Sequence, residues 1–142
     1  MGESGLSQVD ERARRFSDAE RRVAEFLVSA GHEVIAVGAA DPGARGRLGN
    51  RPDALVDGVP TDFVVLATGD TGAAVAMALS RAARHADQAV IDARGSGLAV
   101  VAAHEGIRRF QAVPHSRDLR GWRVVGDGYD INAMSAAPHV SP

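Results

Sequence analysis

The sequence predicts a single α/β domain in which a mixed sheet carries helices on both faces. Amphipathic helical runs alternate along the chain with short apolar runs bounded by turn residues, a pattern typical of this fold class. The 142 residues suffice for one domain with its own core. A hydrophobic content of 45% with 24% charged residues indicates a globular chain. We expect the order helix–strand–strand–strand–helix–strand, followed by a further helix and strand.

Residues 1–16 are expected to form a leader, with a short helix over Gln8–Phe16. Ser17 and Glu20 have the spacing of a capping box, in which each side chain bonds the other residue's backbone N–H. The amphipathic run that follows predicts a helix that ends at Gly31, because glycine commonly terminates helices.

Turn residues divide the rest of the chain into strands and helices. The Gly-, Pro- and Arg-rich stretch from Gly38 to Arg51 is long enough to be a functional loop. Asp70 or Thr71 is expected to cap the second helix. From Asn132 onward the composition is that of a tail, so the domain is expected to span residues 17–131 and the tail 132–142. The expected strands cover 32–37, 53–57, 59–67, 88–93, 122–125 and 129–131, and the helices cover 72–86 and 98–110.

The most informative signal is Asp57-Gly58 between two apolar runs, which predicts a hairpin with a two-residue type I′ turn. The register that follows from this turn places Asp53 directly opposite Asp62. Facing carboxylates on neighbouring strands lie about 5 Å apart at Cβ and repel each other. A divalent cation is the first candidate to offset that repulsion.

Each acid also has a purely structural interpretation. Asp53 follows a proline, and aspartate is common where a turn leads into a strand. Glu20 already has a role in the capping box, whereas Asp62 interrupts an apolar strand and is costly there without a partner. Asp92, at the end of another strand, is expected to pair with Arg94 rather than to bind a metal.

The composition excludes several classes of site. The chain has no cysteine, which excludes disulfides, thiolate metal sites and cysteine nucleophiles. All 16 basic residues are arginines and the net charge is −2, which is not typical of a nucleic-acid-binding domain, although clustered arginines are compatible with phosphate contacts. Aromatic content of 4% argues against a base-stacking platform. No signal peptide or membrane span is evident, so we expect a soluble, cytoplasmic chain.

Five sequence runs keep one order within residues 17–131: Glu20–Val34, Pro52–Phe63, Val90–Leu98, Gly106–Phe110 and Arg123–Asp130. Together they resemble the C-terminal tRNA-nuclease toxin domain of contact-dependent growth-inhibition (CdiA-type) proteins. The helix–three strands–helix–strand core, with Pro-Asp before one strand and an acid on the next, is also similar to the PD-(D/E)xK nuclease superfamily.

This resemblance implies a metal-dependent ribonuclease. Asp53 and Asp62, with Glu20 as the acid of the first helix, would be the catalytic residues and would hold Mg²⁺ or another divalent metal. Val64 stands where the superfamily pattern has a lysine, and the chain contains no lysine. The candidates nearest in sequence for contacts to RNA phosphates are Arg51, Arg81, Arg84 and Arg94.

The resemblance further implies tRNA or another RNA as a partner, an immunity protein if the chain is a toxin, and no membrane partner. Its site of action would be the cytoplasm, reached by delivery with a larger secreted carrier. One alternative is a catalytically impaired relative that binds nucleic acid or a protein without cleavage. Another is metal-independent RNA cleavage, with His85 or His104 as acid or base and Arg84 on the phosphate. A small-molecule enzyme on the same core is a third.

Overall fold

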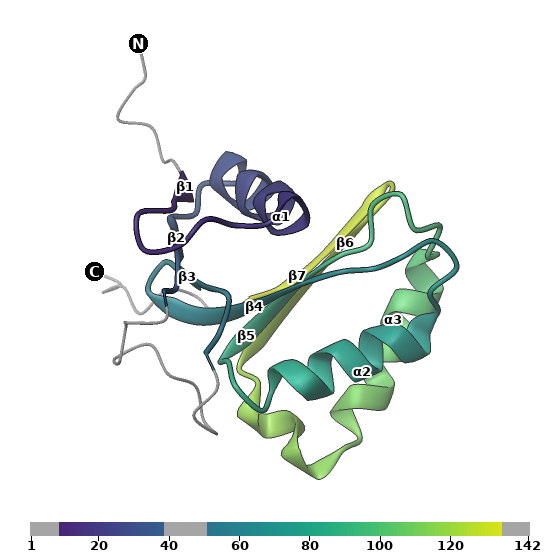
Figure 1. The fold of residues 1–142 in the computed structure, drawn as a ribbon. Coiled ribbons are helices and arrows are strands. Elements are labelled where there is room, and N and C mark those ends of the chain that lie inside the picture. The colour runs from purple at the N-terminus through teal and green to yellow at the C-terminus, as the bar shows by residue number, and fades with distance from the viewer. Residues whose placement is uncertain (1–8, 39–50, 135–142) are drawn as a thin grey trace, which may run out of the picture.

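A computed structural model describes residues 9–38 and 51–134 of the chain (Figure 1). Within these residues seven strands form one mixed sheet whose spatial order follows the sequence, from β1 to β7. The strands are β1 (Val9–Asp10), β2 (Val34–Ala36), β3 (Ala54–Val56), β4 (Val59–Val65), β5 (Gln88–Asp92), β6 (Gly121–Gly126) and β7 (Tyr129–Ala133). The helices are α1 (Asp18–Ser29), α2 (Gly72–Ala82), α3 (Val100–Gln111) and the short 3₁₀ helix η2 (Pro114–Asp118).

The start of α1 confirms the predicted capping box. Ser17 Oγ accepts a hydrogen bond from the Glu20 N–H at 3.1 Å, and Glu20 Oε1 accepts one from the Ser17 N–H at 2.9 Å. The helix ends just before Gly31, where the backbone turns to a positive φ of 99°. Its buried face packs Val23 and Leu27 against the sheet.

The helix expected over Gln8–Phe16 is wrong for the residues that the structure describes. Val9 and Asp10 form β1, which pairs in parallel with β2, and the chain then runs without regular structure to α1. Phe16 inserts its ring into the core at 5.7 Å from the Phe63 ring. Sheet pairing and burial of Phe16 therefore override the local helical pattern of this segment.

The predicted hairpin is confirmed together with its register. Asp57 and Gly58 both have positive φ, 51° and 81°, as a type I′ turn requires. Val56 pairs with Val59 across the turn, and β3 and β4 are antiparallel. The strands are shorter than expected, but the pairing direction and the facing residues are those that the turn dictates.

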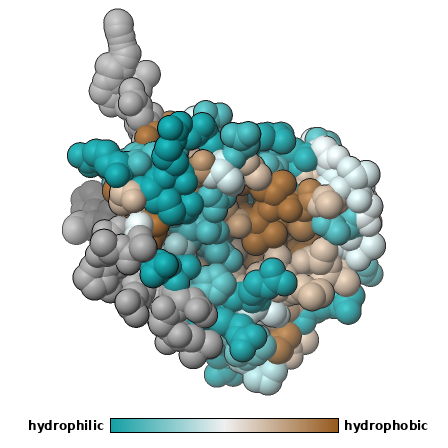
Figure 2. All heavy atoms as spheres, viewed as in Figure 1, coloured by the Kyte–Doolittle hydropathy of each residue, from teal (hydrophilic) through white to brown (hydrophobic). Residues whose placement is uncertain are grey.

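Helices cover both faces of the sheet, as predicted (Figure 1). Strands β4, β5 and β6 are parallel, and α2 and α3 connect them in turn. Successive residues of β5 enter different cores: Ile91 packs with α2 and α3, whereas Val90 packs on the α1 side. Figure 2 shows the most apolar patch of the visible face right of centre, where Figure 1 has the strands between α1 and α2, with paler apolar surface below it over α2.

Other element ends differ modestly from expectation. α2 stops at Ala82, α3 starts at Val100, and β7 runs through Asn132 to Ala133, past the expected start of the tail. Thr71 is the N-cap of α2, but its side chain makes no capping hydrogen bond. Residues 39–50, most of the expected loop, lie outside the described residues. In the described parts of the chain, no helix combines the length and the apolar character needed to span a bilayer.

Candidate active site

The β3–β4 hairpin brings Asp53 and Asp62 together, as the register predicted. The Asp53 N–H donates to the Thr61 carbonyl at 3.1 Å, and the Phe63 N–H donates to Asp53 Oδ2 at 2.8 Å, so the Asp53 carboxyl extends the ladder just before β3 begins. The Asp53 and Asp62 carboxyls lie close enough for each to shift the pKa of the other. Asp62 is buried, with 8% of its surface exposed. The two acids therefore form a compact pair.

Burial keeps a proton on this pair. Desolvation raises the pKa of Asp53 to about 7, and the hydrogen bond to Asp62 and the charge of Glu20 add to that rise. Desolvation also raises the pKa of Asp62, while the nearby positive charge of Arg81 opposes the rise. Because adjacent carboxyls titrate as one system, the pair holds a shared proton below about pH 7.

Glu20 is the third acid of the cluster, and α1 supplies it through the capping box. Its carboxylate is hydrogen-bonded to Asp53, and Arg14 Nη1 donates to Glu20 Oε1 at 3.1 Å. Burial alone would raise the pKa of Glu20, but the Ser17 N–H and the Arg14 guanidinium outweigh it and hold that pKa below its usual value. Glu20 is therefore ionised next to the protonated pair.

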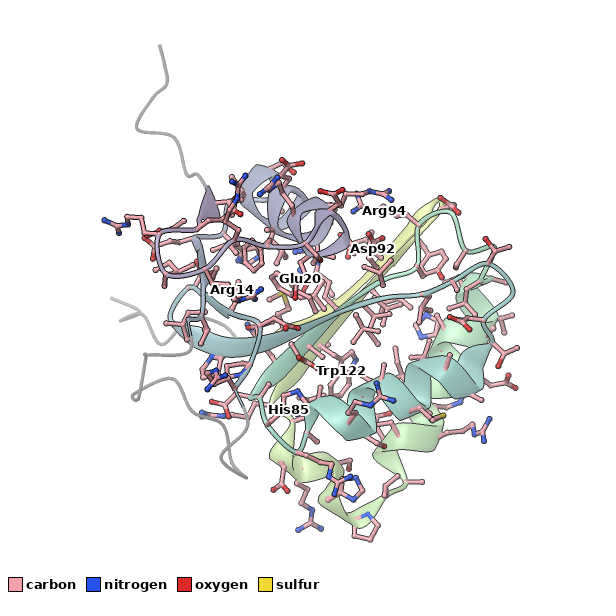
Figure 3. All side chains as sticks on the ribbon, in the orientation of Figure 1. Arg14, Glu20, His85, Asp92, Arg94 and Trp122 are labelled. Atoms are coloured by element: carbon pink, nitrogen blue, oxygen red, sulfur yellow. The ribbon has the colours of Figure 1, made fainter. Side chains whose placement is uncertain are left out.

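Arg14 joins three segments at the acidic cluster. Besides Glu20, its guanidinium donates to the Asp53 carbonyl at 2.9 Å and to the Val37 carbonyl at 3.0 Å. Figure 3 shows Arg14 and Glu20 side by side, beneath α1 and next to the sheet. The arginine thus holds α1, the end of β2 and the start of β3 in one arrangement.

The other side of the acid pair faces the end of α2. His85 Nε2 lies 3.2 Å from Asp62 Oδ2, in the turn that follows α2. Desolvation lowers the pKa of His85, and the charges of Arg81 and Arg84 lower it further, so the imidazole is largely neutral at pH 7. The positive charge of Arg81 therefore lowers the pKa of both Asp62 and His85.

The structure brings only some of the predicted arginines to the acids. The charge of Arg81 lowers the pKa of Asp62, and the charge of Arg84 lowers the pKa of His85, so both lie near the acids. Arg51, in contrast, is exposed just before Pro52. Arg94 is held by Asp92 through two hydrogen bonds, of 2.8 and 2.9 Å, which confirms the expected pairing. Figure 3 shows this pair well apart from Glu20 and His85. The second histidine that the sequence offered, His104, is exposed on α3.

Val64 lies on β4, two residues after Asp62. Its side chain is partly buried and packs against the core beneath α2 and α3. An apolar side chain therefore occupies this position. The positive charges near the acids belong to Arg81 of α2, which lowers the pKa of Asp62, and to Arg14, which bonds Glu20.

The donor set suits a hard divalent cation, because Glu20, Asp53 and Asp62 offer carboxylate oxygens, which Mg²⁺ prefers. Among the residues that the structure describes, no three acidic or histidine side chains are spaced as metal ligands. The aspartates instead satisfy each other through their shared proton, and a cation would have to displace that proton to bind.

The sequence analysis did not identify Arg14 as a site residue, and it did not predict that His85 contacts the acid pair. Arg14 belongs to a segment expected to be helical, and its partners are far away in the sequence. The position of His85 depends on where α2 ends relative to β4. The one available signal was its spacing of four residues from Arg81, which places both near one helix end.

A family model described as the contact-dependent growth inhibition CdiA C-terminal domain matches residues 50–129, more than half of the chain. The match contains Asp53, Asp62 and His85, whereas Glu20 and Arg14 lie before it. No curated protein and no solved structure matches the chain.

Proposed function

Because the chain belongs to the family of contact-dependent growth inhibition CdiA C-terminal toxin domains, we propose that it is a metal-dependent ribonuclease that cleaves tRNA. The observation that carries the proposal is that three carboxyls, from α1, the start of β3 and β4, lie near enough to shift one another's pKa beside an arginine, although they are not spaced as metal ligands in the described residues. Such clusters are costly without a cation or a proton, and functional sites are where proteins commonly retain them.

Glu20, Asp53 and Asp62 would hold the divalent cation. The cation would lower the pKa of a bound water and offset negative charge on the scissile phosphate. The PD-(D/E)xK likeness of the acids supports this part of the proposal, and their oxygen donors fit Mg²⁺ or Mn²⁺.

The chain's own residues supply the remaining roles. Arg81 is positioned to stabilise phosphate charge, but an arginine stays protonated and cannot act as a base in place of the missing lysine. His85 is largely neutral, and its Nε2 lies 3.2 Å from Asp62 Oδ2, so it can accept and return a proton beside the acids. Arg14 positions Glu20 and the start of β3.

Cleavage of purified tRNA tests the proposal. We expect cleavage with Mg²⁺ or Mn²⁺, loss of cleavage with a chelator, and a fall of at least about 10²-fold in Asp62→Asn, because ligand loss removes the metal's contribution. Asp127→Asn, an exposed acid in the β6–β7 turn, is the matched control and should keep full activity. Absence of cleavage with every divalent metal would contradict the proposal, and retained tRNA binding would then favour the non-catalytic alternative.

The Asp62–His85 contact favours one second candidate, metal-independent cleavage by general acid–base catalysis. With Nε2–H donating to Asp62, Nδ1 of the neutral ring is left to accept a proton. Activity that survives the chelator and is lost in His85→Ala would establish this mechanism. Activity that requires the metal and falls only partly in His85→Ala would exclude it.

Family membership also bears on partners. Toxin domains of this family act with immunity proteins and belong to larger carrier proteins. We extend this to the present chain: it would act in the cytoplasm of a target cell, and an immunity protein would block the acidic cluster or the approach to it.

A further inference from the structure

A groove of about 930 Å³ runs along the outer side of α2, where α2 meets α3 and η2. Apolar side chains form part of it, among them Met77 and Phe110, and three arginines border it: Arg81, Arg84 and Arg109. Met77 is 63% exposed, a large fraction for an apolar side chain.

The groove adjoins the acidic cluster. Arg81 and Arg84 line it, and the charges of the same two residues act on His85, which lies against Asp62. A polymer that places one phosphate at the acids therefore has a direct continuation into the groove, past the end of α2.

The lining is positive although the whole chain is negative. Three guanidinium groups and His115 line the groove, against Asp118 as the acidic residue, and Asp118 has an interaction of its own. Arginines in the last turns of α2 and α3 also stabilise the helix ends, which is a purely structural reason for their presence. Arg108 shares that position in α3 but does not line the groove, so the two roles can be separated.

We propose that this groove binds the RNA strand that flanks the scissile phosphate, with phosphates at Arg84 and Arg109 and riboses or bases against Met77. The inference rests on the proposed nuclease function and adds a second, non-catalytic part of the substrate site. Guanidinium groups match phosphate geometry, and apolar surface between them matches the uncharged units that separate the phosphates of RNA. An acidic polypeptide offers similar charges, but continuity with the acids favours the substrate strand.

Binding of labelled tRNA to the full chain tests this inference. Asp62→Asn serves as the background, because it removes a proposed metal ligand and the carboxylate that contacts His85. In that background we expect Arg109→Ala to raise the Kd about three- to tenfold and to lower the salt dependence by about one phosphate contact. Met77→Glu should weaken binding similarly, because it places a carboxylate among the phosphates. Arg108→Ala, the matched control, should change the Kd less than about twofold.

The inference would be overturned if tRNA did not bind, if Arg108→Ala and Arg109→Ala had equal effects, or if poly-L-glutamate displaced tRNA with the same dependence on Arg109. The last result would assign the groove to an acidic protein partner. If the chain cleaves tRNA but Arg109→Ala leaves tRNA binding unchanged, the groove inference is wrong and the proposed nuclease function stands. If the chain binds tRNA in a way that depends on Arg109 but never cleaves it, the groove is still an RNA-binding site and the proposed nuclease function is wrong.

Discussion

At the scale of single residues, the Asp53 carboxyl connects the candidate site to the stability of the fold. Its pKa is about 7 in the folded protein against an ordinary value of 3.8, chiefly because the group is buried. The folded state therefore binds this proton more tightly than the unfolded chain. The resulting stabilisation is complete below pH 3.8 and is lost as the pH rises through about 7.

We expect the free energy of unfolding to fall by about 1 kcal/mol between pH 6.5 and 8.5 in a metal-free buffer. The lowered pKa of His85 acts in the opposite direction around its ordinary value of 6.5, so it offsets part of the fall near the lower end of this window. Urea denaturation at several pH values measures the slope. Asp53→Asn should remove most of it, whereas Asp127→Asn should not. A stability that is constant or rises over this window would show that the pair is ionised in the folded protein.

The acid pair could be predicted from the sequence because it depends on one local feature. Asp57-Gly58 fixes a type I′ turn, the turn fixes the register, and the register fixes which side chains face each other. The proton on the pair could not be predicted, because it depends on burial beneath elements that come from elsewhere in the chain.

At the scale of elements, α2 and α3 approach each other through glycine. A Cβ on Gly106 would meet the Gly72 carbonyl oxygen, and it would lie 2.7 Å from Val75 Cβ. A glycine inside a helix normally costs about 0.5–1 kcal/mol relative to alanine, so its presence in α3 indicates a packing requirement. This contact sets how closely α2 and α3 pack. Because both helices line the groove described above, their separation also affects its width.

We expect Gly106→Ala to destabilise the protein by about 1–3 kcal/mol, because crowding of the Gly72 backbone exceeds the gain in helix propensity. Chemical denaturation measures the change. Glu105→Ala, at the exposed neighbouring position of α3, should change stability by less than about 0.5 kcal/mol. An increase in stability for Gly106→Ala would show that α2 and α3 lie farther apart than described.

Most elements could be predicted because their signals are local: the capping box of α1, the apolar runs of β4 and β5, and the turn before β7. The Gln8–Phe16 segment could not, because its structure depends on pairing with β2 and on burial of Phe16 against Phe63. The same holds for Arg14, whose partners are Val37 just after β2, Asp53 just before β3, and Glu20 on α1. Contacts between residues far apart in the sequence determine the structure of both, and local sequence patterns cannot predict such contacts.

At the scale of the whole molecule, the acidic cluster joins both halves of the fold. Glu20 and Arg14 come from the α1 side, Asp53 and Asp62 from the hairpin, and His85 from the end of α2. A cation bound there would connect these parts only in the folded state. Its binding should therefore raise the stability of the entire domain.

We expect Mg²⁺ or Mn²⁺ to raise the thermal midpoint more at pH 8 than at pH 6, because at the lower pH the cation must displace the proton shared by Asp53 and Asp62. At ten times the Kd the gain is about 1.4 kcal/mol, or roughly 3–6 °C for a domain of this size. Thermal scans with and without metal measure it, and this readout is independent of RNA and of cleavage. Asp62→Asn should abolish the shift, and Asp127→Asn should keep it. An equal shift at both pH values, or one that persists in Asp62→Asn, would place the cation elsewhere on the molecule and leave the three carboxyls with a structural role alone.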